Sequence, residues 1–126
     1  MDIIVTTPKS EIENARKEAE FIKKYKEDKG AFRFRTFRFK PKVEVGDKIF
    51  FVNDGFIKGY LTIFDIDVGS EYCEVTDREW GDENSIVLKF KRWTPLKNPI
   101  PMKGFQGIRY LDRLPEIKEK IMAQIK

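Results

Sequence analysis

Bulky aromatic and cationic residues alternate along residues 32–39, which read Phe-Arg-Phe-Arg-Thr-Phe-Arg-Phe. A period of two places successive side chains on opposite faces of a β-strand. The alternation therefore predicts a strand with one apolar and one cationic face. The phase of the aromatic residues slips between Phe34 and Phe37, so we expect a bulge or a sharp bend near Thr36. Without it, aromatic side chains occupy both faces and some are exposed.

The pattern of the central region predicts further strands. Asp2–Thr6 has the pattern of a short buried strand, and residues 49–52 and 56–64 form a hairpin around the Asn53-Asp54-Gly55 turn. Residues 72–75 and 85–93 form two more strands, joined by an acidic loop over residues 77–83. Three prolines make residues 94–101 an extended loop.

A helix is predicted near each end of the chain. Ser10 and Glu13 form a capping box for a helix that ends near Gly30. Pro115 opens a second helix, whose apolar face carries Ile117, Ile121 and Ile125. Together the elements indicate an α+β fold, a small mixed β-barrel of about five to six strands flanked by an N-terminal and a C-terminal helix. Residues 1–126 are expected to form a single domain.

Charged residues make up 37% of the chain, and both signs are abundant, as is typical of a thermophilic protein. Residues 31–60 contain seven Lys and Arg against three Asp and Glu, and residues 88–126 contain ten against three. Residues 61–87 contain one against eight. If the two basic blocks meet in the folded protein, they form a face that attracts phosphate. The alternative is that they neutralise the acidic block.

Missing residue types exclude several kinds of chemistry. With no His and one Cys, the chain cannot build a zinc or iron site of the usual ligands or an internal disulfide, and no cofactor is expected. Cys73 also lacks the histidine base of a cysteine nucleophile, so we expect a buried structural thiol. The chain contains no glycine-rich dinucleotide motif or Walker motif. Without a membrane-spanning run or a signal peptide, the protein is expected to be soluble and cytoplasmic.

The alternating strand is a candidate nucleic-acid contact, because guanidinium groups bind phosphates and exposed aromatic rings stack on bases. Its candidate residues are Arg33, Arg35, Phe37, Arg38 and Lys40. The alternative is a half-buried core strand whose outer face is solvated by arginine.

A second candidate contact lies late in the chain. Two glycines there allow backbone amides to approach a ligand, and amide, guanidinium and aromatic side chains suit base edges, phosphates and base faces. The residues are Lys103, Gly104, Gln106, Gly107, Arg109 and Tyr110, with Lys91, Arg92 and Trp93 upstream. The alternative is a turn that packs Phe105 and Tyr110 into the core, with Trp93 as a cap on the barrel.

Two segments of the chain resemble the ASCH and wider PUA-like domains. The run Val45-Gly46-Asp47-Lys48 before a hydrophobic strand, followed by Ile57-Lys58-Gly59-Tyr60, is similar to their central hairpin, and the proline-rich approach to residues 103–107 is similar to their late segment. The likeness covers roughly residues 40–113. It implies a pseudobarrel of about six strands with flanking helices, a fold used mostly to bind RNA. The early Gly-x-Lys-x-x-Glu-x-Arg signature of many ASCH domains is missing, since residues 30–35 lack its lysine and glutamate.

The first functional hypothesis is therefore a PUA-like module that binds RNA, or a nucleoside, through the two basic stretches. A second is a small hydrolase or ribonuclease that acts on a modified or unmodified nucleoside or on RNA, for which the weak catalytic candidates are Lys42, Glu44 and Lys103. A third is a protein-interaction module in which the aromatic strand pairs with a partner. No membrane partner is expected, and the pattern does not predict an oligomeric state.

Overall fold

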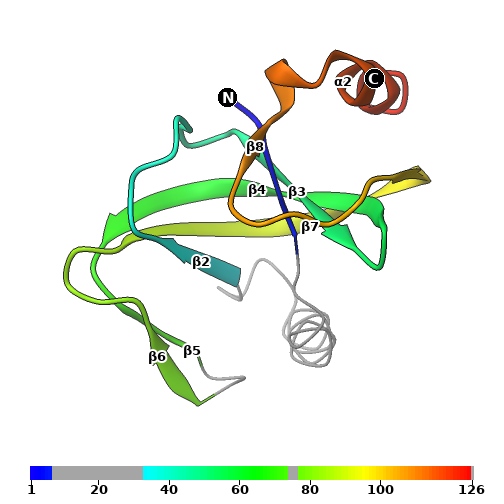
Figure 1. The fold of residues 1–126 in the computed structure, drawn as a ribbon. Helices are drawn as coiled ribbons and strands as arrows, with labels where there is room; N and C mark the ends of the chain where they lie inside the picture. Colours follow the sequence, from blue (N-terminus) through cyan, green and yellow to red (C-terminus); the bar gives the residue numbers. More distant parts are fainter. Residues whose placement is uncertain (7–32, 74–76, 126) are drawn as a thin grey trace.

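A six-stranded sheet that curls into a half-barrel forms the body of the protein (Figure 1). The computed structural model describes residues 1–6, 33–73 and 77–125, so the helix expected between Ser10 and Gly30 lies outside the described residues. The strand order is β2-β7-β4-β3-β1-β8. The strands are β1 (Ile3–Thr6), β2 (Arg33–Phe37), β3 (Lys48–Asn53), β4 (Phe56–Val68), β7 (Ile86–Pro101) and β8 (Arg109–Tyr110).

The predicted hairpin of β3 and β4 and the predicted strand β1 are confirmed. Asp54 and Gly55 both have positive φ angles, 55° and 79°, as the two central residues of a type I′ turn require. The antiparallel pairing continues from Asn53↔Phe56 to Lys48↔Thr62, with one irregularity near Val52. β1 pairs in parallel with β3 and antiparallel with β8. Because β1 lies between two strands, its apolar run Ile3–Val5 is fully buried.

Apolar side chains cover both faces of the sheet. The inner face of the half-barrel holds a cluster that includes Ile3, Val5, Phe51, Leu88 and Phe90. The outer face holds a second cluster, built on Ile4, Phe50, Val52, Ile57, Leu96, Ile100, Leu111 and Ile121.

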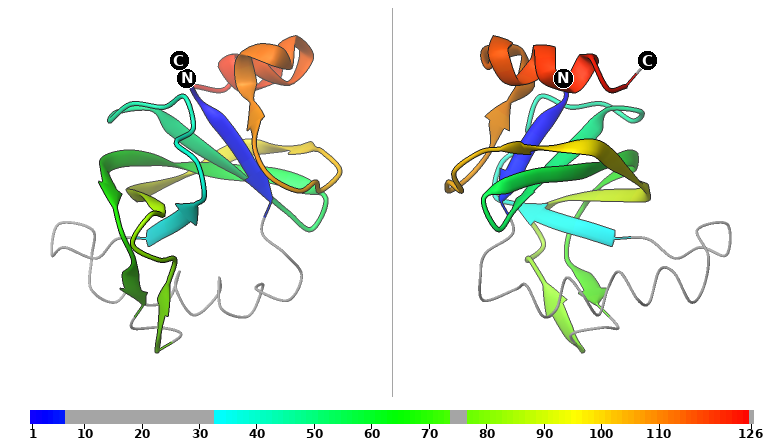
Figure 2. Two further views of the ribbon diagram at one scale, coloured as in Figure 1. Left: turned by 60° about the vertical axis from the view of Figure 1, so that its left-hand side comes forward. Right: turned by 90° about the vertical axis from the view of Figure 1, so that its right-hand side faces the viewer.

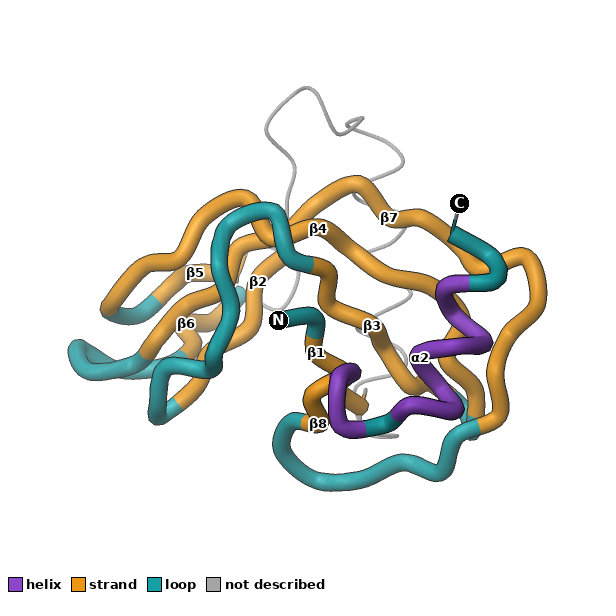
Figure 3. The backbone as a smooth tube through the Cα atoms, turned by 90° about the horizontal axis from the view of Figure 1, so that it is seen from above, coloured by secondary structure: helices purple, strands orange, loops and turns teal. Residues whose placement is uncertain are grey.

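The predicted C-terminal helix is confirmed and covers part of the outer face. Helix α2 (Pro115–Met122) follows the short 3-10 helix η3 (Leu111–Arg113). Ile121 is fully buried, and Ile117 and Ile125 pack against the outer cluster. Figure 3 shows α2 on the side of the sheet away from β5 and β6. In the described part of the chain, no helix is long and apolar enough to cross a membrane.

Strand β2 differs from its prediction in two respects. Its pairing with β7 runs without a break from Arg33↔Phe90 through Thr36↔Val87 to Phe37↔Ile86, so there is no bulge at Thr36. The chain instead bends at Arg38 and Phe39, after the strand has ended. The phase of the aromatic residues is therefore not restored within the strand, and Phe39 is 60% exposed.

The prediction that residues 94–101 form a loop was wrong, because β7 continues to Pro101. Pairing with β4 resumes at Pro95, Ile100 and Pro101, with register shifts between. Proline lacks the N–H that a central strand needs, but it is tolerated at a sheet edge. β2 begins at Arg33, opposite Phe90, so in the described structure the later half of β7 has a single neighbour, β4, and is such an edge.

A separate two-stranded hairpin projects from the half-barrel (Figure 2). It pairs β5 (Glu71–Cys73) with β6 (Arg78–Trp80), so the expected strand at residues 72–75 is present in part. The acidic segment 77–83, expected as a loop, contains β6. Within β6, the guanidinium carbon of Arg78 lies 3.5 Å from the centroid of the Trp80 ring, and the hydroxyl group of Tyr72 on β5 donates a hydrogen bond to the carboxylate of Asp77 beside β6. The side chain of Cys73 lies outside the described residues.

Candidate nucleic-acid interface at the seam of the half-barrel

The half-barrel closes along a seam, which we define as the strip between β2 on one side and β1 and β8 on the other. In the described part of the chain, no strand pairing joins these two sides. Two hydrogen bonds cross the seam instead. Nη1 of Arg35 donates to the carbonyl oxygen of Thr6 at 3.3 Å, and the backbone N–H of Lys42 donates to the hydroxyl oxygen of Tyr110 at 3.1 Å. Residues predicted for function thus hold the two edges together.

Arg35 lies on the inner face of the sheet, not on a separate cationic face as the alternation predicted. It pairs with Leu88, which belongs to the inner apolar cluster, and directly paired residues share a face. Phe37, two residues later, packs on the same cluster, and the guanidinium carbon of Arg35 lies 5.8 Å from the centroid of its ring. The register needed to bury Phe37 therefore also directs Arg35 inward. The side chain of Arg33 lies outside the described residues.

The late glycine-containing segment also meets the end of β1. The backbone N–H of Phe105 donates to Oγ1 of Thr6 at 3.0 Å. A Cβ atom at Gly104 would lie 3.1 Å from the Thr6 methyl group, so a side chain here would require Thr6 to shift by a few tenths of an ångström. Arg35 and the 103–107 segment therefore converge on one residue, Thr6. The two basic blocks of the sequence meet at this point.

Arg109 organises the exposed turn that follows. Its guanidinium carbon lies 4.6 Å from the centroid of the Phe105 ring, and its Nη1 donates to the carbonyl oxygens of Gln106 (3.3 Å) and Ile108 (3.1 Å). A guanidinium group has five N–H donors. Within the described residues, the Nε and Nη2 groups of Arg109 make no hydrogen bond, and the side chain is exposed. Gln106 and Gly107 are exposed beside it, so this turn offers donors to a ligand.

Further cations follow the seam on its solvent side. They are Arg38, Lys40 and Lys42, which follow β2, and Lys103 at the start of the late segment, and all four are exposed. Residues 31–43 and 84–111 contain no Asp or Glu, so no carboxylate from these segments neutralises them. Among the described residues of 65–83, the acidic ones lie toward the end of β4 and on or beside the β5–β6 hairpin. The segments that carry these four cations are therefore net positive, and on the β1 side the carboxylates of Asp2 and Asp47 bind backbone N–H groups.

Trp93 takes no part in the hydrogen bonds that cross the seam, but it lies at the same end of the inner face as Thr6. Gly59 pairs with Phe51, an inner-face residue, so a side chain at Gly59 would point inward. Its Cβ atom would lie 2.6 Å from both Cζ2 of Trp93 and the carbonyl oxygen of Thr94. The indole thus packs directly on the backbone of β4 and is still 42% exposed. The expectation that Trp93 only caps the barrel leaves this exposed ring unexplained.

The neighbours of Trp93 on β7 are placed differently. Arg92 is exposed and has a φ of 66°, an uncommon conformation for a residue with a side chain, which fits the irregular pairing of β7 with β4 at this point. The ammonium group of Lys91 lies 4.8 Å from the centroid of the Phe64 ring. Lys91 is thus engaged with β4 and does not reach the seam contacts at Thr6.

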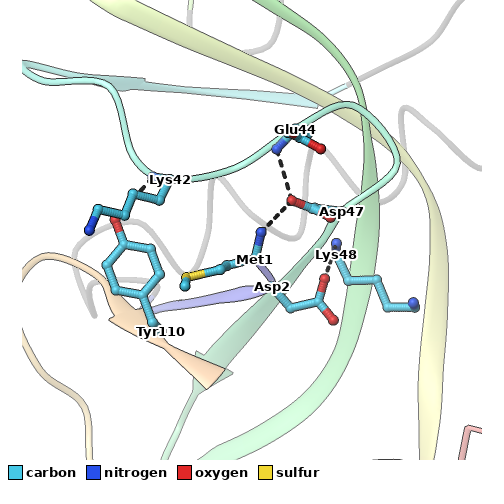
Figure 4. Close-up of polar contacts among 7 residues, drawn as sticks. All are labelled: Met1, Asp2, Lys42, Glu44, Asp47, Lys48 and Tyr110. Carbon is cyan, nitrogen blue, oxygen red and sulfur yellow. Dashed lines mark hydrogen bonds and ion pairs between the residues drawn. The ribbon is translucent and has the colours of Figure 1, made fainter. Parts of the chain in front are cut away.

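The three catalytic candidates do not form one group. Lys42 and Glu44 are exposed, and their side chains extend in opposite directions along the loop (Figure 4). Lys42 is held beside Tyr110, which pairs with Ile3 at the beginning of β1. Lys103 precedes the residues that contact Thr6, at the other end of that strand. Among the described residues, no group of three or more Cys, Asp or Glu is placed to hold a metal ion.

The Gly46-Asp47 motif before β3 has a structural role. Oδ2 of Asp47 accepts hydrogen bonds from the ammonium group of Met1 (2.7 Å) and from the backbone N–H of Glu44 (2.8 Å), while Oδ1 of Asp2 accepts the N–H of Lys48 (2.9 Å) (Figure 4). Partial burial by itself raises the pKa of Asp47, but the hydrogen bonds from Met1 and Glu44 outweigh it, so the pKa is lowered. The carboxylate orders the loop before β3.

Two residues of this interface were missed by the sequence interpretation. Thr6 contacts both basic segments, but nothing in the local pattern distinguishes it from any other strand-terminal residue. Phe39 belongs to the alternating stretch but was not assigned a role. The sequence feature that could have identified Phe39 was the slip in the two-residue period of the aromatic residues, which implied that some aromatic side chain must be exposed.

Comparison with known proteins supports the fold. No protein-family model and no curated protein matches the sequence. The structure is similar to the crystal structure of ASCH from Zymomonas mobilis, with a TM-score of 0.58, 11% sequence identity and coverage of 94% of each chain. Crystal structures of two mutants of that protein give TM-scores of 0.59 and 0.56 at 11% identity, and cover 94% and 92% of this chain and 96% and 95% of theirs. The predicted ASCH-like, PUA-like fold is confirmed.

Proposed function

We propose that this ASCH-like domain binds RNA along the seam of the half-barrel. The observation that carries the proposal is the convergence of Arg35 and the 103–107 segment on Thr6, which joins two basic regions that are distant in the sequence. Phosphate contacts position a nucleic acid, while donors and aromatic rings near them contact its bases.

The groups along the seam suit these two tasks. Exposed Arg38, Lys40 and Lys103 bind phosphates as cations, and the Nη2 and Nε groups of Arg109 bind a phosphate through two donors. The exposed amide of Gln106 and the exposed ring of Trp93 supply a hydrogen-bonding group and a stacking surface for a base. The acidic β5–β6 hairpin repels phosphate and so restricts binding to the seam.

The test is the binding of a fluorescein-labelled RNA carrying both single-stranded and hairpin segments, measured by fluorescence anisotropy at several salt concentrations. We expect Kd values in the micromolar range or below at low salt, because neutralised phosphates release counterions. The double variant Lys40→Ala/Lys103→Ala removes two seam cations. We expect it to weaken binding about tenfold or more and to reduce the slope of log K against log salt by about 1.4.

The matched control is the double variant Lys97→Ala/Lys120→Ala. It also removes two exposed lysines, but one lies on the late half of β7 and the other on α2. We expect it to retain the affinity of the unmodified protein to within about twofold. Absence of binding at low salt, or equal losses in the two double variants, would contradict the proposed interface.

A further inference from the structure

We infer that the ligand of the seam is a single strand whose unpaired bases stack on two separate aromatic residues, Phe39 and Trp93. This inference rests on the proposed RNA binding and adds to it the class of RNA. The two rings are among the most exposed aromatic side chains of the described residues, at 60% for Phe39 and 42% for Trp93. They lie beyond opposite ends of β2, so one ligand that contacts both must extend along that strand.

Phe39 has the surroundings of a stacking residue. The bend at Arg38 and Phe39 directs the chain away from the sheet directly after β2, so the ring is not drawn into the inner cluster as Phe37 is. Its sequence neighbours Arg38 and Lys40 are both exposed cations. An exposed ring between two cations binds the face of a base and the phosphates on either side of it.

Trp93 presents a second ring in a different way. Its indole packs on Gly59, so the backbone of β4 supports one part of the ring while the rest remains open to solvent. A ring held by close packing loses little conformational freedom when a base stacks on it. Arg92, exposed beside it in a left-handed conformation, supplies a cation at the same point.

The separation of the two rings determines the class of ligand. Phe37 pairs with Ile86 and Arg33 with Phe90, so Trp93 lies three residues beyond one end of the β2–β7 ladder and Phe39 two residues beyond the other. At about 3.3 Å per residue, the path is roughly 20 to 30 Å long. A lone nucleoside cannot span it, and the paired bases of a duplex do not expose their faces. A single strand on the order of four to eight nucleotides fits.

The experiment measures the affinity of labelled oligoadenylates of two to twelve nucleotides and of a twelve-base-pair RNA duplex at one fixed salt concentration. We expect the affinity to rise steeply with length up to about six to eight nucleotides and then to level off. We expect the duplex to bind at least tenfold more weakly than the twelve-nucleotide strand.

Two substitutions identify the stacking residues. Phe39→Ala and Trp93→Ala are each expected to weaken binding of the eight-nucleotide strand five- to hundredfold. Trp93→Phe, which keeps a stacking ring, is expected to retain most of the affinity that Trp93→Ala loses. The control is Tyr72→Ala, which removes a ring that is 53% exposed on the acidic hairpin and is expected to leave affinity unchanged. Thermal unfolding of each variant checks that the fold is retained.

The outcomes separate this inference from the proposed function. If no RNA binds, the RNA-binding proposal itself fails. If RNA binds in a salt-dependent manner but duplex and single strand bind equally, or Phe39→Ala and Trp93→Ala both bind like the unmodified protein, then the seam contacts phosphates without stacking on bases. In that case the inference of a single-stranded ligand is overturned and the proposed function stands.

Discussion

The two ends of strand β1 are held in place by groups of opposite charge. At the beginning of β1, the carboxylates of Asp2 and Asp47 accept hydrogen bonds from backbone N–H groups of the loop before β3 (Figure 4). At the end of β1, Thr6 accepts hydrogen bonds from the Arg35 guanidinium and from the backbone of Phe105. At one end, carboxylates therefore accept backbone N–H groups, and at the other Thr6 accepts one donor from a cationic side chain and one from the backbone.

The difference lies in which groups remain available to a ligand. At the Asp47 end, a half-buried carboxylate is used by the backbone of its own loop and by an ammonium group. At the Thr6 end, the cation of Lys103 is exposed, and Arg109 in the same late segment keeps donors that the described residues do not use. The Gly-Asp motif of the resemblance therefore stabilises the fold, whereas the exposed cations and unused donors along the seam remain available for binding.

The largest expected effect comes from Gly59→Val, which places a side chain where the Trp93 ring now packs. The clash involves a backbone oxygen as well as the ring, so the strand cannot relax freely, and we expect a loss of about 2 to 3 kcal/mol in the free energy of unfolding. Urea denaturation measures it. Because Trp93 is displaced, RNA affinity should fall as well. Retention of full affinity by the folded variant would show that the Thr6 end binds without Trp93.

A smaller effect is expected from Asp47→Asn at the other end of β1. Loss of the charged acceptor for Glu44 and Met1 should cost about 1 kcal/mol at neutral pH, with no change in RNA affinity. The folded-state pKa of Asp47 lies below its usual value of 3.8, so the carboxylate stabilises the protein above that pH and the contribution is lost as pH falls through the lowered pKa.

Unfolding of the unmodified protein and of Asp47→Asn, followed across pH 2 to 7, measures this contribution. The difference in stability between the two should shrink below about pH 4. A change in RNA affinity in this variant, with the fold intact, would show that the two ends of β1 are not functionally separate.

The smallest effect is expected from Lys118→Ala on α2. Nζ of Lys118 pairs with Oδ1 of Asp112 at 2.5 Å, and this pair holds the pKa of Asp112 below its usual value, but the carboxylate is exposed to solvent. We therefore expect no measurable change in Tm and no change in RNA affinity. A loss of affinity equal to that of a seam lysine would mean that α2 contributes to binding and that the basic surface is wider than the seam.

The local sequence pattern was sufficient to predict β1, the β3–β4 hairpin and the helix that begins at Pro115. Each depends on neighbours in sequence: a buried apolar run, an Asn-Asp-Gly turn, or isoleucines at helical spacing. The short motifs around Gly46-Asp47 and Gly59-Tyr60 were sufficient to predict the ASCH-like fold. The residue types of the candidate interface were also visible in the sequence, since alternating arginines and a late glycine-containing segment are local features.

Only the tertiary structure decided how those residues are arranged. The face that Arg35 occupies follows from its register with Leu88, and β7 continues through its prolines where, among the described residues, it pairs with β4 alone. Thr6 joins Arg35 and Phe105 across separations of 29 and 99 residues. Closure of a curled sheet brings distant residues together according to strand order and register, and neither is encoded in any short stretch of the chain.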